Sequence, residues 1–235
     1  MTGQTQKKNY MKQHRRKQQS GSTILEFSIC VPVLATLFFG IVGLGVMMGR
    51  YMQAIQVDRD VAHMYSDGVD FTQTTPQNII VQQLALGTGI TATGGNGVII
   101  LSQVITPELA DCNAAAVTTA NCKNQGVPVF TQRIVIGKKS LRTSNYGTPT
   151  STLMDASGNI AASVYLTNSD PSVTVNSLFL TQLTAAATSA GNSTAAPLQP
   201  QGNIAYIVET FFPYPDVGFL GYSTAGGAYS SFIFN

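Results

Sequence analysis

The sequence predicts an α+β fold, in which a long N-terminal transmembrane helix is followed by a mainly antiparallel β-sheet domain with short helices. Residues 27–48 carry no charge and are almost all apolar. Several short β-branched runs come after them, and turn residues separate these runs. Residues 71–235 are long enough to build one ordinary hydrophobic core.

The basic charge of the chain is concentrated in its first 21 residues. This tail holds six of the 13 Lys and Arg residues and none of the 11 Asp and Glu residues. The remainder is therefore acidic overall and lacks the basic surface that a nucleic-acid-binding domain needs. We expect no nucleic-acid partner.

The apolar segment is long enough to cross a membrane. As a helix its 22 residues span about 33 Å, against about 30 Å for a hydrocarbon core. A secretory signal peptide has a shorter apolar run, so a retained anchor is favoured over a removed signal. Basic flanks stay in the cytoplasm. We therefore expect a single-pass inner-membrane protein with three parts. These are a basic cytoplasmic leader (1–21), a transmembrane helix with a helical extension (22–70), and an extracytoplasmic, periplasmic α+β domain (71–235).

An acidic residue stands at the start of the apolar run. Glu26 would cost free energy inside the hydrocarbon region, and a position among the lipid headgroups is the simplest explanation for it. However, Glu26 is the fifth residue counted from Ser22, Gly21 comes directly before Ser22, and the basic tail precedes Gly21. This arrangement resembles the prepilin-type processing signal of type IV pilins and pseudopilins.

The resemblance implies a processing event and a set of partners. In that family a membrane-embedded aspartic peptidase cuts on the cytoplasmic side directly after the glycine, which places the cut between Gly21 and Ser22. Glu26 is then implied to pair with the new amino group of a neighbouring subunit, which would offset the burial of both charges. The implied partners are the prepilin peptidase, other pilins and pseudopilins, the pilus assembly platform and membrane lipid.

One branch of the family is favoured. The order Gly-x-x-x-x-Glu-Phe, an early Pro32 and the glycines at 40, 43 and 45 resemble TadE/TadF-type pseudopilins, which are minor pilins of tight-adherence (Flp) systems. Residues 203–214 resemble a strand near the end of such proteins more loosely, and the end of the span, GLGVMMGRY, departs from the family pattern. The resemblance implies a structural role in assembling a tight-adherence pilus for adhesion or secretion. Whether the chain enters the extracellular pilus is left open.

A helical extension is expected over residues 49–67, with Gly68 as its C-cap. Apolar residues recur there at three- and four-residue steps, whereas Asp58, Arg59 and Asp60 fall elsewhere. The stripe comprises Tyr51, Ala54, Val57, Val61 and Met64. This pattern favours packing against the protein's own domain, and a partner helix is the alternative.

Three residues in or directly after the apolar segment are expected to shape helix packing. Gly45 and Gly49 have the GxxxG spacing that lets two helices approach closely. Pro32 lies early in the same segment.

The rest of the chain reads as strands and turns with a short helix. Pro76 opens a helix that Gly87 ends, and a Gly/Thr loop follows to residue 97. Expected strands cover 97–105, 127–136 and 203–212, with weaker ones at 160–167 and 228–234. Residues 184–202 are low in complexity and predict a loop or an assembly-ordered surface.

The cysteines favour a disulfide over a metal site. Cys112 and Cys122 are close in sequence, and an oxidising compartment would join them; two free thiols are the alternative. The chain has no CxxC and two His residues, so we expect no metal and no cofactor. Glu108 and Asp111 lie near Cys112, where a solvated loop is favoured over a weak calcium site.

No catalytic arrangement is evident in the sequence. It has no HExxH motif, no nucleophile elbow and no clustered carboxylates, so we expect no enzyme. The alternative to a pseudopilin is an uncleaved single-pass membrane-anchored periplasmic binding protein. A secreted enzyme behind an unusual signal peptide is a third reading.

Overall fold

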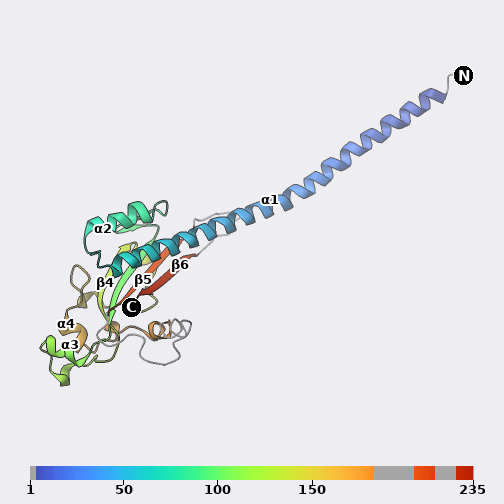
Figure 1. Cartoon of the computed structure of the whole chain (residues 1–235). Coiled ribbons are helices and arrows are strands. Elements are labelled where there is room, and N and C mark those ends of the chain that lie inside the picture. Colours follow the sequence, from blue (N-terminus) through green and yellow to red (C-terminus); the bar gives the residue numbers. More distant parts are fainter. Residues whose placement is uncertain (1–3, 183–203, 215–225, 235) are drawn as a thin grey trace. The chain divides into compact units, whose positions relative to one another are not determined.

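The computed structural model describes residues 4–182, 204–214 and 226–234, with side chains described from residue 24 onward. The chain divides into two compact units, Met1–Met48 and Gly49–Asn235. Helix α1 (Gln4–Ser66) forms the first unit and continues into the second (Figure 1). The low-complexity segment 184–202 lies outside the described residues. The architecture confirms the predicted class: a long apolar N-terminal helix, an antiparallel sheet and short helices.

Helix α1 ends where the sequence predicts. Gly68 adopts a left-handed conformation with φ +84°, and the Val69 amide donates to the Met64 carbonyl at 3.0 Å. A glycine accepts this conformation without the steric cost that a Cβ atom imposes. The glycine cap turns the chain out of the helix toward the rest of the domain.

The second helical segment differs in detail from the prediction. Helix α2 (Thr74–Ile79) begins two residues before Pro76, and a π-helical turn η1 (Ile80–Leu84) follows it. Proline is tolerated so near a helix start because the first backbone N–H groups have no intrahelical partner. Within the predicted Gly/Thr loop the chain forms a small hairpin of strands β1 (Ile90–Thr91) and β2 (Gly94–Gly95).

The domain is organised around a four-stranded antiparallel sheet. Its strands are β3 (Val98–Ile105), β4 (Val129–Gly137), β5 (Ile204–Pro213) and β6 (Gly227–Phe234), in the order β4-β3-β5-β6. All four occur where β-branched runs predict strands. Strand β3 is central and almost fully buried, which explains why its sequence is apolar on both faces.

One predicted strand is wrong. Residues 160–167 contain helix α4 (Ala162–Thr167) rather than a strand. Alanine favours a helix at its start, and a helical spacing brings Ala162, Tyr165 and Leu166 to one cluster with the two domain cysteines. Other short elements include α3 (Leu109–Ala114), the 3₁₀ turns Thr119–Asn121, Lys139–Leu141, Ser151–Leu153 and Pro171–Val173, and a helical segment at 177–182.

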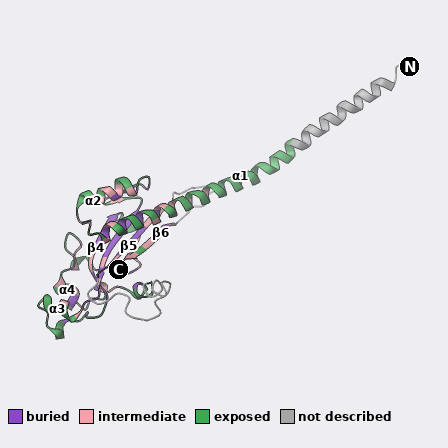
Figure 2. Cartoon of the chain, in the orientation of Figure 1, coloured by how far each residue is buried: buried purple, intermediate pink, exposed green. Residues whose placement is uncertain are grey.

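The two faces of the sheet are covered by different segments. The last turns of α1 lie along one face, where the core is buried (Figures 1 and 2). Its buried sheet members include Ile99, Leu101, Ile134, Ile136, Val208 and Phe212. On the other face, Tyr146 and Phe179 are fully buried against Phe130 and Ile207. The sheet therefore joins the α1 extension to the loops of the domain.

Candidate functional site

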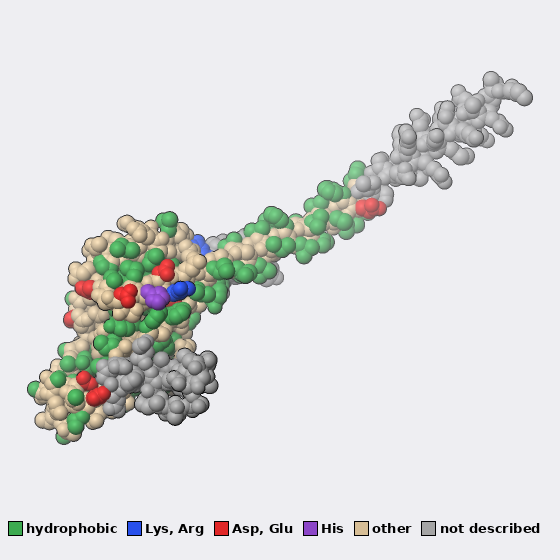
Figure 3. Space-filling model, in the orientation of Figure 1, with side chains coloured by type: hydrophobic (Ala, Val, Ile, Leu, Met, Phe, Trp, Pro, Cys, Tyr) green, Lys and Arg blue, Asp and Glu red, His purple; other side chains and the backbone are tan. Residues whose placement is uncertain are grey.

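The first part of the candidate site is a bare apolar helix. Between residues 24 and 48 the large hydrophobic side chains of α1 are exposed, with Ile24 at 72% and Ile41 at 71% (Figures 2 and 3). Among the described residues, one helix is long and apolar enough to cross a membrane, and this segment supplies its apolar window. Because such a surface is unfavourable in water, it fits a single-pass membrane anchor.

The predicted processing residues lie at the start of this anchor. Gly21 and Ser22 belong to α1, although their side chains lie outside the described part of the chain. Glu26 is exposed on the same helix. Glu26 follows Ser22 by four positions, so the two lie about one turn apart on one helix face. The processing role of these three residues stays a prediction.

The predicted packing residues are accessible along the anchor. Helix α1 continues through Pro32, which has no N–H to donate to the Ser28 carbonyl. A Cβ atom built on Gly45 or Gly49 meets nothing within 4 Å. No contact within the described chain requires glycine at these two positions, which remain predicted packing positions for a partner helix.

The second part of the candidate site is the joint between α1 and the sheet. Ala54, Val57 and Val61 are fully buried, as the predicted stripe requires, whereas Tyr51 is half exposed. Packing against the protein's own domain is therefore confirmed for this segment. Tyr65 adds a polar contact, because its hydroxyl donates to Gln132 Oε1 on β4 at 2.7 Å.

Asp58 lies on the packed side of α1, contrary to the prediction. It was expected away from the packed stripe, yet it is fully buried between α1 and the sheet. The hydroxyl of Thr210 donates to its Oδ1 at 3.0 Å, and that of Ser230 donates to its Oδ2 at 2.8 Å. These two donors compensate part of the desolvation. Burial nevertheless raises the pKa of Asp58 to about 7, because its effect is larger than that of the two hydroxyls, which lower the pKa.

A second buried carboxylate lies on the opposite face of the sheet. Glu209 on β5 accepts hydrogen bonds from the Asn145 amide and the Tyr229 hydroxyl, both at 2.8 Å, and from Ser144. Its Oε2 is 4.0 Å from the Arg133 guanidinium on β4. The only sequence signal for this cluster was a charged residue inside an apolar run.

The disulfide is present as predicted. Cys112 in α3 and Cys122 are bonded, and both are buried against Leu166 of α4. The acidic pair beside it has a structural role, since the Glu108 amide donates to Asp111 Oδ2 at 2.7 Å at the start of α3. The favoured solvated loop is therefore a short capped helix. No cluster of three metal-ligating side chains occurs in the part of the chain that the structure describes.

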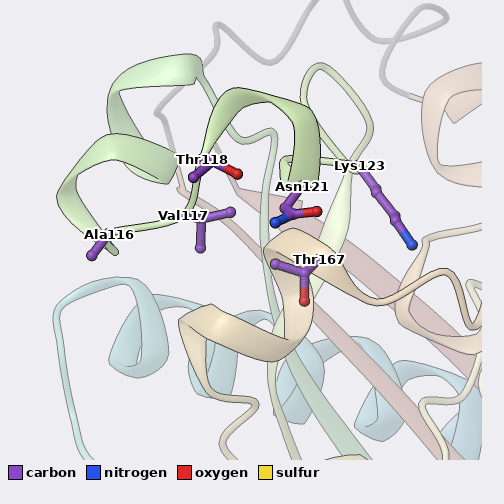
Figure 4. A pocket seen from close by; sticks show the side chains of 6 residues that line it. All are labelled: Ala116, Val117, Thr118, Asn121, Lys123 and Thr167. Carbon is purple, nitrogen blue, oxygen red and sulfur yellow. The ribbon is translucent and has the colours of Figure 1, made fainter.

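A polar hollow of about 410 Å³ lies beside the disulfide loop (Figure 4). Its lining consists of Ala116, Val117, Thr118, Asn121, Lys123 and Thr167. The Asn121 and Thr167 side chains approach each other, while Lys123 points away from them (Figure 4) and donates to Ser169 at 3.1 Å. The lining contains no carboxylate, imidazole or thiol that would serve as an acid, base or nucleophile.

Together, an uncovered apolar helix and a sheet that packs against its extension, residues 49–66 or the stalk, fit a protein with a single-pass membrane anchor. Residues 21–63 match the model of the TadE-like protein family, so the resemblance to TadE-like minor pilins is confirmed over this segment. No curated protein and no solved structure matches the chain. The match covers the anchor and most of the stalk, and the sheet lies outside it.

Proposed function

We propose that this chain is a structural minor pilin, or pseudopilin, that takes part in assembling a tight-adherence (Flp) pilus for adhesion or secretion. One observation supports the proposal most strongly: the TadE-like match begins at Gly21, the residue directly before the proposed cut. The match then runs through the anchor and into the stalk. A structural role is what this family implies.

The proposed processing separates the leader from the anchor. A prepilin peptidase cuts between Gly21 and Ser22 on the cytoplasmic side, and the apolar helix stays in the inner membrane. The domain then lies in the periplasm, since the Lys and Arg residues gather on the leader side of the span. Other pilins and the assembly platform are the proposed partners, and lipid surrounds the anchor.

After the proposed cut the helix starts at Ser22, and the sequence there suits a helix start. Thr23 and Glu26 have the spacing of a capping box, in which the side chains of the first and fourth residues satisfy backbone N–H groups. A carboxylate near a helix N-terminus also interacts favourably with the helix dipole. Glu26 would therefore stabilise the new helix N-terminus and also place a negative charge near it.

Co-expression with the cognate prepilin peptidase tests the proposal through the intact mass of the purified chain. We expect a mature N-terminus at Ser22 for the natural sequence. Gly21→Leu should remain uncut, because the bulky side chain obstructs the peptidase cleft, whereas Gly43→Leu should be cut normally. A natural chain that keeps its leader in its own cell while the pilus assembles would overturn the proposal and favour the uncleaved binding protein.

A further inference from the structure

A cavity of about 450 Å³ opens on the face of the sheet that α1 does not cover. Ile100 of β3 and Val135 of β4 line it from the sheet, together with Arg133, and nine residues between Lys139 and Met154 line the rest. Its volume falls within the range of small-molecule sites. None of the residues that line it belongs to the joint between α1 and the sheet.

Three cationic side chains line this cavity: Arg133, Lys139 and Arg142. Arg133 is buried, and Glu209 lies 4.0 Å from it. Neither Lys139 nor Arg142 forms an ion pair within the described part of the chain. The cavity therefore carries an excess of positive charge, which favours a negatively charged ligand.

The two arginines are held in place by packing. The Arg142 guanidinium lies 4.0 Å from the centre of the Tyr229 ring, and its Nη2 donates to Asn145 at 3.0 Å. The Arg133 guanidinium lies 4.7 Å from the centre of the Phe130 ring. Within the described residues, the Nε atoms of both are buried without a hydrogen-bond partner. A guanidinium group that packing holds in one orientation suits carboxylate recognition.

The other lining groups suit a ring that carries hydroxyls. Thr143, Thr148, Thr150 and Ser151 supply hydroxyl groups, and Met154 joins the apolar side chains of the sheet. A sugar presents C–H faces to apolar walls and hydroxyls to polar ones. From this combination with the cationic wall, we propose that the cavity binds an acidic sugar, with a hexuronate carboxylate against Lys139 and Arg142.

The full chain in phosphatidylcholine nanodiscs allows a direct test, since nanodiscs avoid the sugar headgroups of common detergents. Methyl β-glucuronide would be titrated by saturation-transfer difference NMR, beside methyl β-glucoside as the uncharged analogue. A ligand of this size is expected to bind with a Kd on the order of 1 mM. The glucoside should bind far more weakly, because it lacks the carboxylate.

Two neighbouring lysines provide a matched control. Both are exposed, but Lys139 lines the cavity and Lys138 does not. Lys139→Gln should weaken glucuronide binding about three- to fivefold, the effect of losing one exposed ion pair, and Lys138→Gln should leave it unchanged. Arg142→Gln should weaken binding further, and Arg142→Lys should restore part of it.

Several results would overturn the proposal. They are no saturable glucuronide signal at tens of millimolar, equal binding of the glucoside, or equal losses in the two lysine variants. Competition by inorganic phosphate at the same concentration would show a site for any oxyanion rather than for an acidic sugar. None of these measurements depends on whether the chain is cut after Gly21.

Discussion

The Thr210 hydroxyl on β5 donates a 3.0 Å hydrogen bond to the Asp58 carboxylate on α1, although the two lie 152 positions apart in the sequence. Ser230 on β6 donates to the other carboxylate oxygen at 2.8 Å. One acidic side chain therefore ties the stalk to two strands of the sheet. Because it is buried, its charge state affects how firmly the stalk is held.

Asp58 makes the stability of the domain depend on pH. The residue lies in the Gly49–Asn235 unit, outside the apolar span, and burial raises its pKa from 3.8 to about 7. The folded state thus binds a proton more tightly than the unfolded state. Protonated Asp58 therefore adds to the free energy of unfolding. This stabilisation is fully present below about pH 4 and is lost as the pH rises to about 7, and the total loss is at most about 4 kcal/mol.

The variant Asp58→Asn should remove that dependence, because its amide is neutral at every pH. Urea unfolding of the full chain, followed by circular dichroism between pH 4.5 and 8, measures the effect. The natural protein should lose stability over this range while the variant stays nearly constant. Asp60→Asn is the matched control, since Asp60 is exposed on the same helix. Parallel pH profiles for the natural protein and Asp58→Asn would contradict the assignment.

Glu209 should be among the most sensitive positions of the domain. Glu209→Ala removes the acceptor of the Tyr229 and Asn145 hydrogen bonds and leaves the buried Arg133 without its ion-pair partner. Breaking a buried pair in this way costs about 3–5 kcal/mol. Denaturant midpoints measure the loss, with Asp67→Ala as an exposed control. A loss below about 1 kcal/mol would show that the cluster contributes little.

Local sequence signals predicted most of the fold. The β-branched runs located all four strands of the main sheet, and Gly68 located the end of α1. The run at 160–167 misled, because its β-branched and aromatic residues also fit one face of a short helix packed on the disulfide. A short apolar run does not distinguish a strand from a helix by periodicity alone.

The disulfide should stabilise the part of the domain around α3 and α4. Replacing both Cys112 and Cys122 with serine removes a cross-link between two residues that are 10 positions apart in the sequence. On the chain-entropy model, the free energy of unfolding then falls by about 3 kcal/mol. Thermal or denaturant unfolding of the variant measures this loss. The natural protein under reducing conditions should unfold like the variant. Equal stability of the oxidised and reduced forms would contradict the prediction.

The sequence predicted the anchor better than the joint between α1 and the sheet. The anchor and its motif are contiguous in sequence, so the spacing from Gly21 to Glu26 was visible directly. Asp58 was not placed correctly, because its partners on β5 and β6 are more than 150 residues away. Helical periodicity identifies the apolar face of a stalk, but it does not show that two distant hydroxyls donate hydrogen bonds to a carboxylate there.

Gly45 should matter for contacts between helices and not for the fold of the chain. Gly45→Leu meets open space, so the stability of the domain should be unchanged. If a partner helix packs on the Gly45 face, the bulky side chain should reduce co-purification of other pilins several-fold. Gly43→Leu is the matched control, since Gly43 is also open but lies on roughly the opposite side of the helix. Equal effects of the two variants would argue against a specific packing face.

Glu26 can act through its charge or through its hydrogen-bonding geometry, and one substitution separates the two. Glutamine keeps the capping-box geometry with Thr23 but removes the negative charge. We expect Glu26→Gln to be cut after Gly21, as intact mass would show, and to be incorporated into the assembly poorly. The reason is that the amino group of Ser22 then lacks a counter-charge in a medium of low dielectric constant. Glu26→Asp, which keeps the charge on a shorter side chain, should assemble better than Glu26→Gln. Natural levels of assembly with glutamine would instead assign Glu26 to capping the helix.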